Sequence, residues 1–308
     1  MKQPTIPEWI DHFLAADPPR SKSLVMTIFG DAVSPHGGSV WLGSLIELAA
    51  PFGQSDRLVR TSVFRLAQEN WLAASRDGRR SAYSIAPSSL VRFEHANRRI
   101  YTPPGPDWDG SWTLLLAAAS LSAPARALVR KELAWEGYAQ LAPGILGHPA
   151  ARADVLDEIL SRLDLRGQVP VCVARDLPGA PGRPMRELAA ECWELAPVIG
   201  AYRHFVEVFE PLAALLRTGC GAVSPQQAFV LRTLLVHAYR RVQLHDPMLP
   251  VALLPQPWPG TQAFELAREV YRATFALAEE HVMEVLRREE PEAPAADAGF
   301  YERFGGLG

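Results

Sequence analysis

The most constraining feature of the sequence is an arginine-rich pair of short strands that directly follows an amphipathic helix. Residues 55–70 read SDRLVRTSVFRLAQEN, and Ser55 or Asp56 is suited to cap a helix at its N-terminus. A short apolar run at 71–75 and an alternating run at 81–86 then flank RDGRR, whose Asp77-Gly78 pair is typical of a tight hairpin turn. A helix that leads directly into a hairpin restricts this part of the chain to few folds.

Two further helices are predicted upstream, at residues 23–33 and 42–52, with Gly53 ending the second. Three helices followed by a hairpin form the order of a winged helix-turn-helix domain. At about 100° per residue, the third helix gathers Val59, Val63 and Leu66 into a core stripe opposite polar and cationic side chains. Such side chains read base edges and hold phosphates. The predicted DNA-binding residues are Arg57, Arg60, Thr61, Arg65, Gln68, Arg76, Arg79, Arg80 and Tyr83. The alternative interpretation is a solvated amphipathic helix.

The charge of the chain is unevenly distributed. The total over 308 residues is only −3, which by itself argues against a nucleic-acid partner. Residues 57–99 carry a net +6, however, and the rest of the chain carries −9. All the basic residues of that segment are arginines, which favours bidentate contacts with phosphate or guanine. This asymmetry is typical of a nucleic-acid-binding module joined to domains of another function.

The middle of the chain is predicted to fold as a ferredoxin-like domain. A stretch rich in Pro and Gly at 101–112 marks its boundary. Strands are expected at 113–119, 138–146 and 169–174, and helices at 124–135 and 153–163. This order approaches β-α-β-β-α-β, although the second and third strands are not clearly separated.

The last third is predicted to be nearly all helical from residue 185 to residue 288. Residues 202–216 show helical spacing, and Ser224-Pro225 opens a helix that extends to about Gln243. A Pro-rich connector at 246–260 leads to a last helix at 261–288. The tail from residue 289 has the composition of a flexible segment, yet it ends in the aromatic cluster FYERF at 300–304. Disorder and docking of that cluster, on the body or on another subunit, both remain open.

The sequence shows no signature of an enzyme, a metal site or a membrane protein. It lacks the G-x-S-x-G, H-E-x-x-H, P-loop and G-x-G-x-x-G motifs, and its eight histidines are scattered. Three cysteines spaced 20 and 28 residues apart form no zinc pattern and are typical of a reducing compartment. The N-terminus has no apolar signal core, and no run approaches the about 20 apolar residues of a membrane helix. A cytoplasmic location is therefore expected.

Aromatic and cationic side chains in the middle and in the last third of the chain suggest a small-molecule site. A pocket with aromatic walls and a few cations suits an aromatic acyl group that carries phosphates. The predicted effector-binding residues are Trp108, Trp112, Trp135, Arg203, His237, Tyr239, Arg240 and Arg241. The alternative is that these are core aromatic residues and surface arginines.

Several motifs, in order along nearly the whole chain, resemble the PaaX family, the repressors of phenylacetic acid catabolism. The motifs are HGGSVWLGSLIELAAPFGQSDRLVRTSVFRLAQENWL at 36–72, GRRSAYSI at 78–85, RRIY at 98–101, WDGSW at 108–112, KELAWEGYAQLAP at 131–143, ECW at 191–193, HAYRRVQLHDPMLP at 237–250, LLPQPWPG at 253–260 and the terminal RFGGL. Together they are far more specific than any one of them alone.

The resemblance implies an α+β, multidomain protein. It implies a winged helix-turn-helix domain at 1–99, a central ferredoxin-like (Cas2-like) domain at 100–184, an all-helical C-terminal domain at 185–288 and a tail at 289–308. It also implies a homodimeric repressor without a cofactor that binds double-stranded operator DNA and is released by phenylacetyl-CoA. Two alternatives stay open: an enzyme that processes CoA thioesters or nucleic acid and uses the winged domain for assembly, and a scaffold protein without a ligand.

Overall fold

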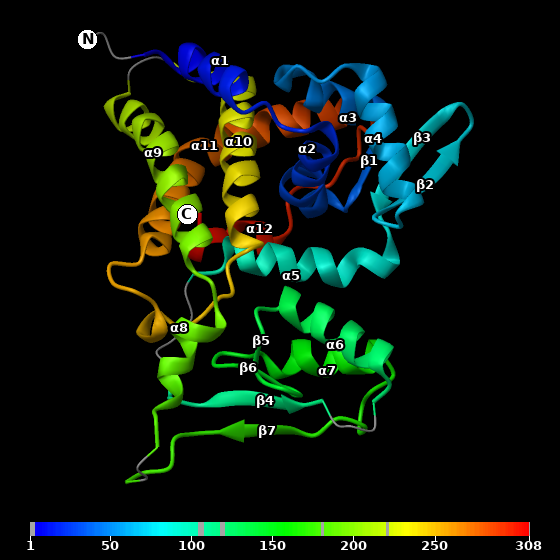
Figure 1. Ribbon diagram of the computed structural model, residues 1–308. Helices are drawn as coiled ribbons and strands as arrows, with labels where there is room; N and C mark the ends of the chain where they lie inside the picture. Colours follow the sequence, from blue (N-terminus) through cyan, green and yellow to red (C-terminus); the bar gives the residue numbers. More distant parts are fainter. Residues whose placement is uncertain (1–3, 104–107, 118–120, 180–181, 220–221, 308) are drawn as a thin grey trace. The chain divides into compact units, whose positions relative to one another are not determined.

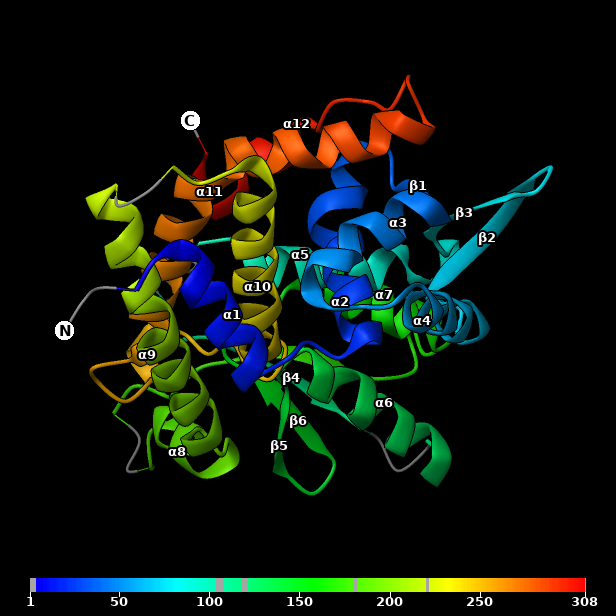
Figure 2. The same ribbon diagram turned by 90° about the horizontal axis from the view of Figure 1, so that it is seen from above.

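The computed structural model describes residues 4–103, 108–117, 121–179, 182–219 and 222–307. It divides into two compact units that do not follow the order of the chain. The first unit comprises Met1–Pro103, Arg203–Gln243 and Gln262–Gly308, and the second comprises Pro104–Tyr202 and Leu244–Thr261. Figures 1 and 2 show the elements in two views. Among the described residues, no helix combines the length and the apolar character that a membrane span needs.

The first unit begins with the predicted helices. After α1 (Ile6–Ala16), α2 (Ser21–Ile28) continues into a π-helix at Phe29–Val33 and a 3₁₀ turn at Ser34–His36, which covers the expected helix at 23–33. The expected helix at 42–52 is α3 (Leu42–Ala49) followed by a 3₁₀ turn at Ala50–Phe52. It ends at Gly53, whose φ of 72° a glycine adopts without strain.

The helix and hairpin that restricted the fold are both present. Helix α4 (Asp56–Gln68) starts at Ser55, whose hydroxyl accepts a hydrogen bond from the Leu58 amide at 3.3 Å. Strands β2 (Leu72–Asp77) and β3 (Arg80–Ile85) form the hairpin, and β1 (Ser39–Trp41) pairs with the other edge of β3. Asp77 pairs with Arg80, so the turn is centred on Gly78 and Arg79, one residue later than predicted. The hairpin projects away from the helices (Figure 2).

Four longer helices also contribute to the first unit: α5 (Leu90–Tyr101), α10 (Pro225–Gln243), the C-terminal part of α9 (Ala196–Thr218) and most of α11 (Pro259–Glu289). Ser224 caps α10 by accepting the Gln227 amide at 3.2 Å, as its position before Pro225 predicted. Side chains all around α10 are buried, because α10 packs against α1, α2 and α5.

The two compact units differ from the expected consecutive segments at 1–99, 100–184 and 185–288, because residues 203–243 and 262–308 belong to the same unit as residues 1–103. The three consecutive domains therefore stay a prediction. Helix α10 is buried on nearly every side, and the N-terminal helices α1 and α2 supply part of its cover.

The tail is ordered, which contradicts the expectation of a flexible segment and decides between docking and disorder. Asp297 caps the short helix α12 (Ala298–Tyr301), and a 3₁₀ turn at Arg303–Gly305 follows. Phe300 and Phe304 are each 1% exposed. The Phe304 ring lies 5.4 Å from that of Tyr101 and 5.1 Å from that of Tyr271. The aromatic cluster therefore docks on the first unit of its own chain.

The second unit contains a four-stranded antiparallel sheet. Its elements are β4 (Trp112–Leu116), α6 (Ala123–Trp135), β5 (Ala139–Ala142), β6 (Ile145–His148), α7 (Ala153–Arg162), β7 (Val171–Ala174) and α8 (Leu188–Cys192). The strand order β5-β6-β4-β7 confirms the β-α-β-β-α-β arrangement. The single strand expected at 138–146 is wrong, because a turn at Gly144, with a φ of 78°, splits it into β5 and β6. Residues 118–119 of the first expected strand lie outside the described residues.

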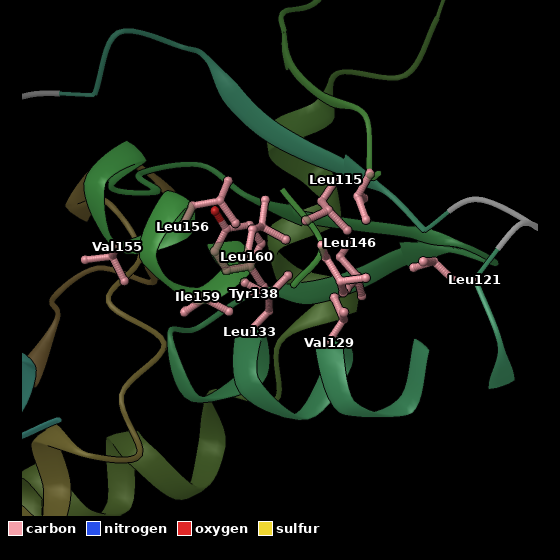
Figure 3. Close-up of a cluster of buried hydrophobic side chains, with 12 residues drawn as sticks. Leu115, Leu121, Val129, Leu133, Tyr138, Leu146, Val155, Leu156, Ile159 and Leu160 are labelled. Carbon is pink, nitrogen blue, oxygen red and sulfur yellow. The ribbon is translucent and has the colours of Figure 1, made fainter. Parts of the chain in front are cut away.

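One face of this sheet carries a hydrophobic core (Figure 3). Leu115 and Leu146 on the strands pack with Val129, Leu133 and Ile159 from α6 and α7. The connector at 244–261 joins the same unit, since His148 Nε2 lies 2.8 Å from the Pro247 carbonyl and the Tyr202 hydroxyl donates to Asp246 at 2.5 Å.

Candidate nucleic-acid interface

The outer face of α4 has the exposure expected of a surface that meets DNA. Its predicted contact residues Arg57, Thr61, Arg65 and Gln68 are all exposed. Val59, Val63 and Leu66 on the opposite side are at most 1% exposed. One stripe of α4 therefore fixes the helix to the unit and the other is free to enter a groove.

The hairpin adds a second cationic surface. Arg76 lies near the end of β2, Arg79 lies in the turn, and both are exposed. Within the part of the chain that the structure describes, Arg57, Arg65, Arg76 and Arg79 make no ion pair with a carboxylate. Guanidiniums that are not neutralised within the chain remain available to phosphates.

Arg60 and Arg80 differ from these four residues because each has a partner inside the chain. Arg60 donates to Asp56 one turn earlier at 2.5 Å. Arg80 lies 4.0 Å over the Trp41 ring and donates to the Glu289 carbonyl at 2.9 Å. Arg80 pairs with Asp77 directly after the turn, so it lies at the turn end of the hairpin as predicted, but Trp41 and Glu289 hold its guanidinium within the chain. Tyr83 is half-buried in β3, opposite Val40 and Ala74.

The C-terminal end of α11 fastens the elements around the hairpin. The Glu289 carboxylate lies 3.4 Å from both the amide and the hydroxyl of Ser44, near the N-terminus of α3, where a negative charge is favoured. The Trp41 indole donates to Glu290 at 3.2 Å, and Arg288 pairs with Glu47. We call these contacts, together with those of Arg80, the α11 clamp. Through it, a displacement of α11 would displace the hairpin and α3 together.

A buried charged cluster lies in the core of the same unit. Asp31, 1% exposed in the π-helix, accepts hydrogen bonds from the hydroxyls of Tyr101 at 2.8 Å and Tyr271 at 2.9 Å. Arg303 of the tail donates to the same oxygen at 3.1 Å, and Arg232 Nε lies in ion-pair contact with the second oxygen at 2.9 Å. Burial and the Asp31 charge raise the pKa of Tyr101 well above its usual value, so its hydroxyl remains a donor.

Glu279 on α11 extends this cluster toward the surface. It accepts from Arg232 at 2.6 Å, and its other oxygen lies 2.8 Å from His36 Nε2. Burial opposes the ionisation of Glu279, but the charge of Arg232 and the hydrogen bond from His36 outweigh it and lower the pKa of Glu279 to about 2. The cluster therefore pairs two carboxylates with two guanidiniums, contributed by segments from both ends of the chain.

The predicted effector residues are divided between the two units. Trp108 and Trp112 belong to the second unit, where the Trp112 ring lies 6.0 Å from those of Trp108 and Trp193. Trp135, at the end of α6, is 47% exposed, whereas Trp112 is buried. The other predicted residues, Arg203, His237, Tyr239, Arg240 and Arg241, belong to the first unit. Neither unit by itself gathers the predicted set into one site.

The first-unit members of this set mostly serve the packing of α10. His237 Nδ1 lies 3.1 Å from the Thr27 hydroxyl, and Arg241 pairs with Asp17 at 2.8 Å. Arg240 donates to the Ser23 hydroxyl at 3.1 Å, and Tyr239 is 1% exposed. Burial, aided by the charges of Arg240 and Arg241, lowers the pKa of His237 to about 4. The imidazole is therefore neutral near pH 7 and brings no charge to a phosphate. Arg203 is exposed.

A groove of about 490 Å³ runs along α11. Its lining includes three carboxylates, Glu279, Glu280 and Glu284, together with Arg287 and His36. The carboxylates outnumber the cations and disfavour the phosphates of CoA, and none of the predicted effector residues that the structure describes lines this groove. Nor do the described residues bring three or more His, Cys, Asp or Glu side chains together in a metal-binding group.

The sequence prediction missed two features of this unit. Phe64 was not among the predicted contact residues, yet it is 60% exposed on α4. Asp31 was not singled out, because a lone acid inside an apolar helix carries no local signal of partners that lie about 200 and 270 residues away. The RFGGL motif did mark the position of Arg303.

Comparison with known proteins finds family models that match three consecutive segments of the chain. The model of PaaX-like protein matches residues 20–88, that of the PaaX protein central Cas2-like domain matches 105–186, and that of the PaaX-like protein C-terminal domain matches 193–284. The chain is 37% identical over 300 residues to the transcriptional repressor PaaX of Escherichia coli (strain K12), across 97% of this chain and 94% of that protein. Among solved structures it is similar to the uncharacterized protein Rv0674 from Mycobacterium tuberculosis, with 23% identity and a TM-score of 0.46, over 81% of this chain and 96% of that one. That last similarity is too low to support an argument.

Proposed function

Because this chain belongs to the PaaX family of transcriptional repressors, we propose that it represses genes of phenylacetate degradation by binding duplex DNA. The Escherichia coli relative is a repressor over nearly the same length. A repressor acts by occupying DNA, so this assignment excludes the alternative of an enzyme that uses the winged domain only for assembly.

The observation that carries the proposal is the set of unneutralised arginines on two adjacent elements. Arg57 and Arg65 lie on the outer face of α4, and Arg76 and Arg79 lie on the hairpin that follows it. We propose that residues 20–88 act as a winged helix-turn-helix in which α4 enters the major groove. In this arrangement the hairpin is a wing that contacts phosphates or the neighbouring minor groove.

We further propose that the repressor is a dimer that binds a two-fold operator. Support comes from β7, which pairs with β4 on one side and, within the described part of the chain, with no strand on the other. Val173 on this edge is 70% exposed, and Leu177 just after it is 76% exposed. Exposed apolar edge strands readily pair with a second copy.

The proposed effector is phenylacetyl-CoA, with no resident cofactor. The α11 clamp supports a route for release, because α11 begins in the second unit and its last residue contacts Arg80 of the hairpin. A ligand that binds more tightly when α11 is displaced would increase the population of dimers in that state. In that state the two DNA-binding segments, residues 20–88 of each protomer, would no longer fit the operator.

Replacing Arg76 and Arg79 together by alanine should weaken operator binding by about tenfold per arginine, because each loses a charge-assisted hydrogen bond to phosphate. The slope of log K against log salt should become shallower by about one for each arginine. Gel-shift titrations between 50 and 200 mM salt measure both effects, and light scattering of the complex should show two protomers per operator.

Arg130→Ala is the matched control, because Arg130 is an exposed guanidinium on α6 of the second unit. Its affinity and salt slope should equal those of the wild type. An unchanged slope in the double variant would contradict the proposed docking of the wing.

Isothermal titration of the full chain should detect binding of phenylacetyl-CoA and none of free phenylacetate, since the acid lacks the phosphates that arginines would hold. The same thioester, added to the protein–operator complex in a gel shift, should release the DNA. Heat from phenylacetate alone, or binding of the thioester without release of DNA, would contradict the proposed effector mechanism.

A further inference from the structure

Two large apolar side chains flank the cationic stripe of α4 on the surface of the protein. Phe64 is 60% exposed and Leu58 is 50% exposed, although α4 has a complete buried stripe of its own. On a wheel of about 100° per residue, each lies about 60° from Thr61, on opposite sides. Phe64 is two turns beyond Arg57 and one turn before Gln68. It therefore shares the face that the proposed function places in the major groove.

The surroundings of Phe64 restrict what can cover it. Arg57, Arg65, Arg76 and Arg79 carry positive charge without carboxylate partners in the described chain, so the complementary surface is anionic. A phenyl ring gains nothing from a phosphate. The one apolar group that B-DNA presents on its major-groove edges is the 5-methyl group of thymine.

We propose that Phe64 is a specificity-determining residue that packs on a thymine methyl in each operator half-site. This inference rests on the proposed DNA binding and adds which base is read by apolar contact. Arg57, Arg65 and Gln68 lie on the same face. Their side chains can donate hydrogen bonds to phosphates or to the edges of purine bases.

The test combines a protein variant with a change of one methyl group in the DNA. The full-length chain first selects its tightest duplex from a random library. Each thymine of that duplex is then replaced singly by deoxyuridine, which lacks only the 5-methyl group. Loss of a buried methyl costs about 0.8 kcal/mol, so at one symmetry-related position Kd should rise about fourfold, and about fifteenfold when both half-sites are changed.

With Phe64→Ala the thymine duplex itself should bind about as weakly as the doubly substituted duplex binds to the wild type. The uridine replacement should then cost nothing more, because the methyl has lost its partner. Phe64→Leu, which keeps an apolar surface, should retain most of the discrimination. Leu128→Ala is the matched control, since Leu128 is 45% exposed on α6 and lies outside the proposed interface.

The outcomes separate this inference from the proposed function. If no duplex is selected above random sequence, the proposed DNA binding itself fails. If a duplex is selected and the uridine penalty is equal in the wild type and in Phe64→Ala, DNA binding stands and the methyl contact is overturned. A change in oligomeric state of Phe64→Ala with an intact uridine penalty would assign Phe64 to a protein interface instead.

Discussion

Replacing Asp31 by alanine should lower the free energy of unfolding of the first unit by about 3–5 kcal/mol. The substitution removes the acceptor shared by two tyrosines and two guanidiniums and leaves Arg232, which is 0% exposed, without one of its two carboxylates. Breaking a buried pair by removing one partner leaves an uncompensated charge, which is the costly case. Because whole domains are stable by only about 5–15 kcal/mol, a loss of this size removes a large part of the stability of the unit.

Urea titration followed by circular dichroism measures this loss, and two other substitutions calibrate it. Asp31→Asn keeps an oxygen for the tyrosine hydroxyls but loses the charge, so its loss should be smaller. Glu69→Ala removes an exposed ion pair with Lys22 and should cost less than about 1 kcal/mol. A loss from Asp31→Ala as small as that from Glu69→Ala would show that the buried cluster does not stabilise the fold.

A chain that ends at Glu289 should lose the cooperative unfolding transition of its first unit. The deletion removes Arg303 from the charged cluster and empties the site of Phe304 among Tyr101, Tyr239 and Tyr271. Truncating one buried Phe typically costs about 3–5 kcal/mol, and the tail buries Phe300 and Leu307 as well. Far-UV circular dichroism should retain helix while the near-UV signal is lost, because packing fails before helices do.

Single substitutions and a peptide make this result specific. Phe304→Ala should cost about 3–5 kcal/mol, whereas Tyr301→Ala should cost little, since Tyr301 is 51% exposed. A synthetic peptide of residues 290–308 should restore the near-UV signal of the truncated chain by mass action. A truncated chain that unfolds as cooperatively as the full one would refute a structural role of the tail.

Most of the correct sequence predictions concern features that neighbouring residues determine. Ser55 and Ser224 cap the helices that they precede, Gly53 ends a helix with a positive φ, and the β2–β3 hairpin closes around a Gly within one residue of its expected place. Each of these depends on a few neighbouring residues, which a sequence displays directly. The exposed face of α4 followed from helical periodicity in the same way.

The failures concern contacts between distant residues. Arg80 lies beside the turn as expected, but its guanidinium packs on Trp41 and donates to the carbonyl of Glu289, which lies about 200 residues further along. His237 looked like a cation within an apolar helix, yet its burial against Thr27 lowers its pKa to about 4. Helical periodicity shows which residues share a face of a helix. It does not show which of their side chains contact a distant part of the chain, because that depends on tertiary packing.

The buried cluster also bears on how the protein is synthesised. Arg303 leaves the ribosome about 200 residues after Tyr101, which at about 5–20 residues per second is a delay of roughly 10–40 s. Throughout that time the nascent N-terminal segment holds Asp31 without Arg303, and until Arg232 is synthesised it also lacks that guanidinium. A chain whose synthesis stops early therefore has every arginine of the proposed DNA surface but an incompletely folded N-terminal segment. Chaperones and proteases would act on such a chain before it could bind an operator.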